Sequence, residues 1–280
     1  MPRVSRRLQA MIEPPHPPAP AVVDTLRIQR MFHRREQEAR AKGLSRSSWL
    51  ALTTATVIGV DSEASMTALY HHATASTNLE ESVAVAELMR EIGLRGIAVV
   101  CIPQIMDMLA AFRASLPSVV RSSLSTTPLG CADADIIESI NQEGGELWNA
   151  IHHPKGRVIE RKLVNAHPDL ANYVKGHVYG GLLARHRSPT VGRMTISLCA
   201  IACLRASRPS SRQLQSHVHG LKKAWEDGSW RSDPGAGLEE GIRWLTSDEG
   251  CMWVLEVVDE LVLAITSGRA AGPAMTVAKL

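Results

Sequence analysis

Residues 193–224, RMTISLCAIACLRASRPSSRQLQSHVHGLKKA, hold the clearest structural signal in this sequence. Up to Ser207 the side chains are mostly small or apolar, which predicts a helix that is buried nearly all round. Pro209 cannot continue that helix but is favourable near the start of another one. Ser210 and Ser211 then provide the kind of side chain that caps a helix N-terminus. We therefore expect two helices joined by a tight break.

The second of these helices carries a histidine in an apolar stripe. Leu214, His217, Val218 and Leu221 share one helical face, which we expect to turn toward the buried helix. A histidine in such a place is either a hydrogen-bonded core residue or a working acid/base. The residues alone leave both possibilities open.

A similar unit occurs earlier in the chain, at residues 49–73, WLALTTATVIGVDSEASMTALYHHA. An offset of 145 residues aligns His72 with His217 and also superposes the helices that precede them. Both copies read as a buried helix, a break, and a helix with a histidine. This internal repeat predicts a duplicated helical unit whose two copies bury their apolar faces against each other.

Helical periodicity with Gly, Pro or Asn breaks accounts for the rest of the chain, and strand-like alternation is absent, so we predict an all-α fold. The predicted helices span residues 22–42, 47–60, 62–75, 79–93, 96–115, 133–151, 156–165, 168–186, 190–206, 210–227, 237–246 and 249–266. The predicted organisation is a flexible arm (1–20), a first helical repeat (21–130), a second repeat with the candidate site (131–266) and a flexible tail (267–280). A Ser/Thr/Pro-rich link at 116–132 joins the two repeats.

The order of these segments resembles the carboxymuconolactone decarboxylase / alkylhydroperoxidase-D-like superfamily, and more narrowly a two-repeat fungal branch of it. The segments that carry the resemblance are 49–73, the Gln213–Ala224 helix, Ile102-Pro103-Gln104-Ile105, His167-Pro168-Asp169-Leu170 and His177-Val178-Tyr179-Gly180. The resemblance implies a duplicated alkylhydroperoxidase-D-like bundle of about ten to twelve helices.

Thiol peroxidases of this superfamily use a CxxC pair ahead of the histidine and a glutamate on the preceding helix. Mapped through His217, these positions hold Ser210, Gln213 and Leu198, so the redox residues are missing. Ser65 and Ala68 replace the cysteines in the first copy. Cys199 and Cys203 share a helical face in an apolar setting, which favours core packing. The alternatives of a thiol-dependent antioxidant and of an inactive helical scaffold remain open.

Decarboxylase-like members rely on acid/base side chains in a helical pocket, so the resemblance implies an enzyme that needs neither cofactor nor metal. We expect His217, Tyr179 and Arg193 to be catalytic: a proton shuttle, a donor to an enolate oxygen, and a bidentate anchor for a carboxylate. The predicted substrate-binding residues are Gln213, His177 and Trp230. The expected reaction is decarboxylation, lyase chemistry, isomerisation or cyclisation of a small carbonyl or carboxylic compound in a biosynthetic pathway.

Two other features have competing explanations. The His152-His153 pair before Pro154 is typical of a helix C-terminus, where histidine favours the helix dipole, and the alternative is a catalytic role. The insertion WEDGSWRSDPGAG after Ala224 contains Trp225 and Trp230, which would form either a pocket lid or a surface loop.

Composition limits the possible partners. The net charge of +3 and the lack of a basic run with interleaved aromatics argue against nucleic acid, and no apolar run is long enough for a membrane span. We expect a small-molecule substrate and a homo-oligomer, because helices such as 249–266 are apolar on more than one face.

Five scattered cysteines indicate a reducing compartment, so we expect an intracellular protein. Ala278-Lys279-Leu280 is a conservative variant of the peroxisomal tripeptide Ser-Lys-Leu. Arg3, Arg6 and Arg7 suggest a mitochondrial alternative, and a cytoplasmic location is the third.

Overall fold

The computed structural model describes residues 24–128, 137–184, 190–207, 212–233, 235 and 237–267. Across these ranges the fold is all-α, with thirteen α-helices, one π-helix and one 3-10 helix. No β-strand occurs in this described part of the chain, and a single isolated bridge pairs Leu44 with Gly237. The predicted fold class is confirmed.

The helix bounds follow the predicted breaks closely. The first half contains α2 (Thr25–Ala41), α3 (Arg46–Gly59), α4 (Glu63–Thr74), α5 (Leu79–Gly96), α6 (Ile102–Ser115) and α7 (Ser118–Ser123). The second half contains α8 (Ile137–His152), α9 (Gly156–Ala166), α10 (Leu170–Asn172), the π-helix η2 (Tyr173–Leu183), α11 (Arg193–Ser207), α12 (Arg212–Glu226), the 3-10 helix η4 (Ser229–Ser232), α13 (Glu239–Leu245) and α14 (Asp248–Thr266).

Side-chain caps fix several of these bounds. Asn78 accepts a hydrogen bond from the Glu81 backbone N–H at 2.9 Å and starts α5, whose first turn is acidic. Ser247 caps α14 in the same way, ahead of Asp248 and Glu249. Each cap satisfies an N–H group that has no partner within its helix, and the carboxylates favour the positive end of the dipole.

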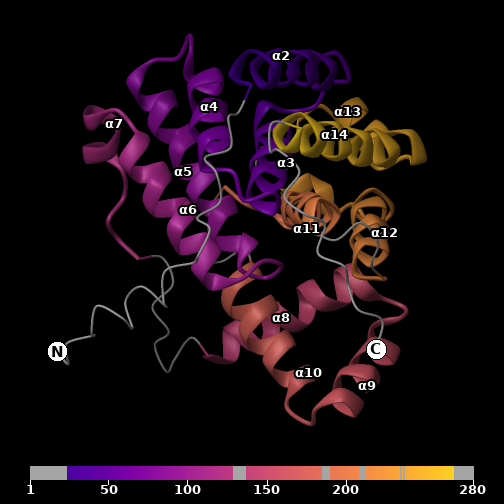
Figure 1. The fold of residues 1–280 in the computed structure, drawn as a ribbon. Helices are drawn as coiled ribbons and strands as arrows, with labels where there is room; N and C mark the ends of the chain where they lie inside the picture. The colour runs from indigo at the N-terminus through magenta and orange to yellow at the C-terminus, as the bar shows by residue number, and fades with distance from the viewer. Residues whose placement is uncertain are drawn as a thin grey trace, which may run out of the picture.

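Helices α3 and α11 cross at the centre of the molecule (Figure 1). Both are buried along most of their length, as their small and apolar side chains predict. A Cβ atom on Gly59 would lie 2.6 Å from the Cβ of Ala206 and 3.3 Å from the Cα of Cys203. A glycine is therefore required at this crossing, because any side chain would push the two helices apart.

Each half also supplies a helix that packs on the central helices of both halves. Helix α5 packs on both α3 and α11, and α14 packs on both α11 and α3. Likewise α2 contacts α14, while η2 contacts α5. A duplicated unit would give this pattern, and the division into two repeats remains a prediction.

The apolar face of α14 is covered within the chain itself. Val254, Val257, Leu261 and Ile265 are at most 1% exposed, against α2, α3 and α11. The argument that this helix needs a partner subunit is therefore wrong, and the homo-oligomer remains a prediction without that support.

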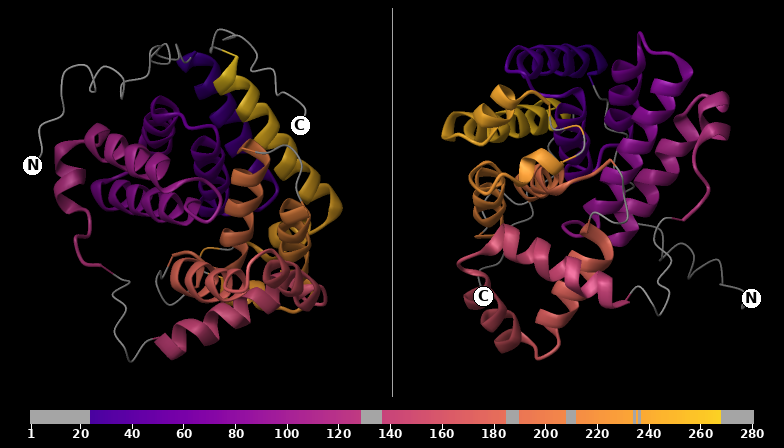
Figure 2. Two further views of the ribbon diagram at one scale, coloured as in Figure 1. Left: turned by 60° about the horizontal axis from the view of Figure 1, so that its bottom comes forward. Right: turned by 180° about the vertical axis from the view of Figure 1, so that it is seen from behind.

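Helices α8, α9 and α10 with η2 form one end of the molecule, next to α12 (Figures 1 and 2). Here α8 and η2 approach closely through two glycines. A Cβ on Gly180 would lie 2.3 Å from the carbonyl oxygen of Ile140, and one on Gly144 would lie 2.5 Å from that of Lys175. This contact fixes the η2 side chains relative to α8.

Two predicted segments differ from the structure. The predicted link at 116–132 contains a short helix, α7, and the predicted helix 168–186 is largely π-helical, which apolar periodicity did not indicate. The N-terminal arm, most of the C-terminal tail and the Ser210 and Ser211 caps lie outside the described residues. No helix in the described ranges combines the length and apolarity that crossing a membrane requires.

Candidate functional site

A cavity of about 280 Å³ lies between α5, α8, η2, α11 and α12. Its wall is mostly apolar, with Val178, Leu183, Ile196 and Leu204 among the lining residues. The polar groups in the wall are few, and they come from four helices: Arg95 on α5, Trp148 and His152 on α8, Tyr179 on η2, and Gln213 and His217 on α12. An apolar cavity with a few converging polar groups is the usual form of a small-molecule site.

His217 lies on the buried face of α12, as its apolar stripe predicts. The residue is 7% exposed, and its Nδ1 atom has no hydrogen-bond partner among the described residues. Burial and the neighbouring His152 lower the pKa of His217 to about 3. The ring is therefore neutral near pH 7, with one nitrogen protonated and the other bearing a lone pair.

His152, at the end of α8, is the second histidine of the site. Its Nε2 atom lies 2.7 Å from the hydroxyl oxygen of Tyr179, and its ring centroid lies 6.0 Å from that of His217. Burial and the nearby Lys223 ammonium lower the pKa of His152 to about 4. Burial also raises the pKa of Tyr179 above its usual range, so the phenol keeps its proton.

Packing holds this pair in place. The Trp148 ring lies one helical turn before His152, with ring centroids 4.2 Å apart, and also contacts Tyr179 at 5.0 Å. The adjacent Gly180 lets η2 approach α8 closely enough for the Tyr179–His152 hydrogen bond. Helix α8 ends at His152, as the sequence predicts, and the side chain of this residue is also buried and contributes to the cavity.

Arg193 does not lie in this cavity, so its predicted convergence with Tyr179 and His217 is wrong. Its Nη1 atom donates to Asp227 at 2.6 Å and Ser229 at 2.5 Å, and its Nη2 atom to the carbonyl oxygens of Ala150 and Gly220 at 2.8 and 3.2 Å. The guanidinium thus joins α8, α12 and η4. A buried structural role explains the residue, because these partners use both of its terminal nitrogens.

Of the three residues predicted to bind substrate, one lines the cavity and two do not. Gln213 lines the cavity from α12. His177 is exposed on η2 with its ring 4.8 Å from that of Tyr173, and it lies outside the cavity. Trp230 also lies outside, stacked on Trp225 at 5.4 Å with Arg231 over its ring. These tryptophans pin a surface segment to α12 and do not form a lid over the cavity.

Arg95, the last basic residue of α5, is a cavity-lining residue that the sequence analysis did not identify. Its side chain is 1% exposed, which is unusual for arginine. A sequence signal was present, because Arg95 lies between Leu94 and Gly96 near the end of an apolar helical face. It cannot be distinguished there from an ordinary basic residue in a last helical turn.

Cys199 and Cys203 both line the cavity, but their environment opposes thiolate chemistry. Burial raises the pKa of Cys203 to about 12 and moves the pKa of Cys199 upward as well. The Cys203 thiol donates to the carbonyl oxygen of Ala55 at 3.3 Å. Because the thiolate is the nucleophile in peroxide reduction, both groups are poor candidates for that role.

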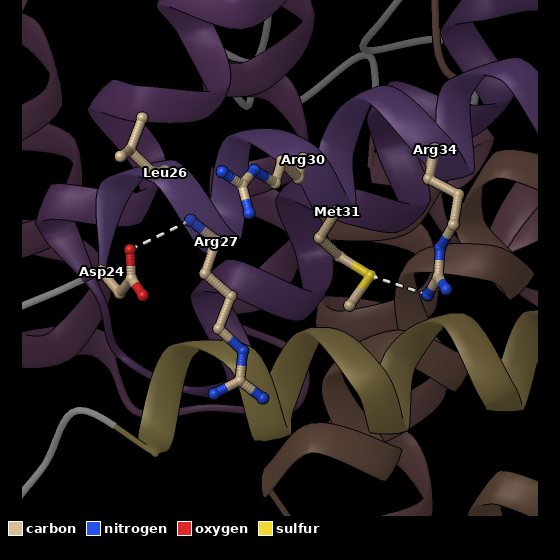
Figure 3. Close-up of a pocket in the computed structure, with 6 residues that line it drawn as sticks. All are labelled: Asp24, Leu26, Arg27, Arg30, Met31 and Arg34. Carbon is tan, nitrogen blue, oxygen red and sulfur yellow. Dashed lines mark hydrogen bonds between the residues drawn. The ribbon is translucent and has the colours of Figure 1, made fainter.

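Two recesses lie in the first half of the chain. One, of about 540 Å³, runs along α2 beside α14, with the arginines of α2 projecting over it (Figure 3). Two of these arginines have partners on or beside α14, since Arg34 pairs with Glu260 and Arg27 donates to Ser267. The recess therefore belongs to a helix–helix contact.

The other recess, of about 740 Å³, contains His72, the residue that the repeat aligns with His217. His72 Nε2 lies 2.8 Å from Glu36 Oε2, and the Trp49 ring lies edge-on at 5.8 Å. Here the histidine has a carboxylate partner from α2.

No group of three His, Cys, Asp or Glu side chains with the geometry of a metal site occurs in the ranges that the structure describes. Comparison of the chain with protein-family models, with characterised proteins and with solved structures yields no match.

Proposed function

We propose that this chain is a cofactor-independent, non-redox enzyme that performs acid/base chemistry on a small carbonyl compound in the cavity around His217. The observation that carries the proposal is a neutral histidine with an unpartnered ring nitrogen beside a hydrogen-bonded histidine–tyrosine pair. Buried polar groups are nearly always hydrogen-bonded, and the unpartnered ring of His217 lines a cavity. A bound substrate would therefore supply the partner that this ring lacks.

Tyr179 is suited to hold the carbonyl oxygen. In the His152 tautomer with its proton on Nε2, that N–H donates to the Tyr179 oxygen across the 2.7 Å contact. The phenol hydrogen is then available to a substrate oxygen. When negative charge develops on that oxygen, the hydrogen bond strengthens, which lowers the barrier to enolate formation.

His217 is suited to move the proton at the neighbouring carbon. Its neutral ring accepts a proton from the carbon next to the carbonyl, and the bonding electrons become an enolate held by Tyr179. Return of the proton to the same or another carbon completes an isomerisation. In a decarboxylation, the bonding electrons of the lost carbon dioxide form the same kind of enolate, and a histidine that has taken a proton from solvent transfers it to the carbon.

The resemblance to the carboxymuconolactone decarboxylase-like superfamily supports this proposal. Its members without the thiol pair are expected to use acid/base side chains in a helical pocket, and buried thiols of raised pKa fit such a branch. Membership in that superfamily is part of the proposal.

Solvent exchange tests the proposal without knowledge of the natural substrate. A series of small ketones and carbonyl acids is incubated with the protein in deuterated buffer, and deuterium incorporation next to the carbonyl is followed by mass spectrometry. We expect incorporation with the wild-type protein and its loss in His217→Gln, whereas His219→Gln, an exposed change on the same helix, retains it. Exchange at the wild-type rate in folded His217→Gln contradicts the proposal, as does a lack of exchange across the whole series.

A further inference from the structure

We propose that Arg95 binds a carboxylate, so that the substrates of this cavity are small monocarboxylates with an apolar body. This inference rests on the proposed function, because it names the substrate class of the same site. It starts from the hydrogen bonds of the Arg95 guanidinium. Its Nη1 atom donates to the carbonyl oxygen of Glu91 at 3.2 Å and to the Glu91 carboxylate at 2.7 Å.

The other two nitrogens of the guanidinium have no partner. Both Nε and Nη2 are buried, and neither has a hydrogen bond to any residue in the described part of the chain. Together they carry three N–H groups, two of which are parallel and form the side-on fork that accepts both oxygens of a carboxylate. A buried guanidinium whose Nε and Nη2 atoms have no partner is suited to bind a carboxylate.

The fork points away from Glu91. In a planar guanidinium the Nε–Nη2 edge lies opposite Nη1, which is the atom that Glu91 binds. Glu91 lines a separate groove and not the cavity, whereas Arg95 lines both. Burial raises the pKa of Cys199, and the positive charge of Arg95 acts against this rise, which places the guanidinium near the cavity wall formed by α11.

The cavity favours a singly charged ligand. Among the described residues that line it, Arg95 is the one with a permanent charge, and most of the remaining wall is aliphatic or aromatic. Because Glu91 already pairs with Arg95, an anion at the fork adds its own charge to the pair. A phosphate dianion would bring two negative charges into this apolar setting, whereas a carboxylate brings one and buries its carbon chain. The volume of about 280 Å³ suits an acid of modest size.

A bound carboxylate would also make the two histidines better bases. A negative charge near His152 and His217 favours their protonated forms and raises their pKa from the low values that burial imposes. A general base is most effective when its pKa lies near the working pH, so the ligand that Arg95 holds would activate the site.

Calorimetric titration of the whole chain tests the inference with matched ligands. The probes are straight-chain and phenyl-substituted carboxylates of increasing length, the corresponding neutral carboxamides, and one phosphonate of the same carbon skeleton. We expect at least one carboxylate to bind about tenfold or more tightly than its carboxamide, because a charged fork discriminates between them. Arg95→Met should abolish this preference.

Arg193→Met is the matched control, since both terminal nitrogens of that arginine have partners outside the cavity, and it should retain the preference. If Arg95→Met does not fold, Arg95→Lys and the wild-type ligand pairs still decide the question. The inference is overturned if no carboxylate binds, if acid and amide bind equally, if the phosphonate binds more tightly, or if folded Arg95→Met keeps the preference. Carboxylate binding without deuterium exchange would refute the proposed function alone. Exchange that is lost in His217→Gln, but that favours carboxylic acids over their amides in neither the wild-type protein nor Arg95→Met, would refute this inference alone.

Discussion

His72 on α4 and His217 on α12 occupy matching places in the two halves, but their surroundings differ. His72 contacts the Glu36 carboxylate at 2.8 Å beside an open recess of about 740 Å³. His217 is 7% exposed, lies in a mostly apolar cavity of about 280 Å³, and has an unpartnered Nδ1 atom. One histidine is stabilised by the chain, and the other is left with unmet hydrogen-bonding capacity.

The difference shows where a helical repeat can diverge. The helices that carry the two histidines are similar, whereas the helices that cover them are not. In the first half α2 supplies the carboxylate of Glu36. In the second half α8 and η2 supply Trp148, His152 and Tyr179, which add little charge but enclose a cavity. Covering helices thus decide whether a histidine is structural or available for chemistry.

The largest effect should come from replacing one histidine at a time. We expect His217→Gln to reduce the deuterium exchange rate about 10²–10⁴-fold, the usual contribution of a positioned acid/base group. His72→Gln should leave this rate nearly unchanged, because His72 lies in a separate recess. Circular dichroism establishes that both variants are folded. An equal loss of exchange rate in the two variants would show that His217 has no catalytic role that His72 lacks.

The next effect is a dependence of stability on pH that belongs to the second half. An unfolded histidine binds a proton near pH 6.5, whereas folded His152 and His217 resist protonation down to about pH 4 and 3. The unfolded state therefore binds more protons below pH 6.5, and the stability present above that pH is lost as the pH falls. Each group should contribute a slope of about 1.4 kcal/mol per pH unit.

Urea unfolding between pH 7 and pH 4 measures this slope. His217→Gln should remove its share, while His219→Gln, an exposed neighbour on α12, should not. A free energy of unfolding that does not change over this range would show that the site is already open to water.

A smaller effect should follow from changing the glycines of η2. Gly180→Ala should destabilise the protein by about 1–3 kcal/mol, because its Cβ would lie 2.3 Å from the Ile140 carbonyl oxygen and α8 would have to move. Gly181→Ala is the control, since its Cβ would lie 3.7 Å from its nearest neighbour, the carbonyl oxygen of Gly176. Thermal unfolding compares the two, and equal melting temperatures would contradict the close α8–η2 contact.

The smallest effect concerns the first half. A double-mutant cycle of Glu36→Gln and His72→Gln should give a coupling energy of about 1 kcal/mol, because the two side chains share a partly buried hydrogen bond. Deuterium exchange should remain at the wild-type rate in all three variants. A coupling near zero would show that Glu36 does not stabilise His72.

The sequence predicted the helices well because their ends carry local signals. Asn78 and Ser247 cap helices through their own side chains, and such contacts depend on residues a few positions apart. Helix α7 was not predicted, and the helix predicted over 168–186 proved largely π-helical, since neither the six residues of α7 nor the wider turn of η2 gives a clear apolar period.

The site was predicted only in part. His217, Tyr179 and Gln213 line the cavity as expected. The buried face of α12 can be read from the residues around His217, whereas the choice of Tyr179 and Gln213 came from the family resemblance. Arg193, His177 and Trp230 do not line the cavity, and His152 and Arg95 do. The difference depends on contacts between distant segments, such as Asp227 with Arg193, and no local pattern reports which partner a buried arginine will find.

The close crossing of α3 and α11 at Gly59 has a consequence for synthesis of the protein. The helix that covers much of α3 is encoded roughly 130 residues after it, which at about 5–20 residues per second is a delay on the order of ten seconds. During that interval α3 can pack on α2, α4 and α5, but the face that α11 covers has no native neighbour. This apolar face of the nascent first half is therefore where a chaperone would bind.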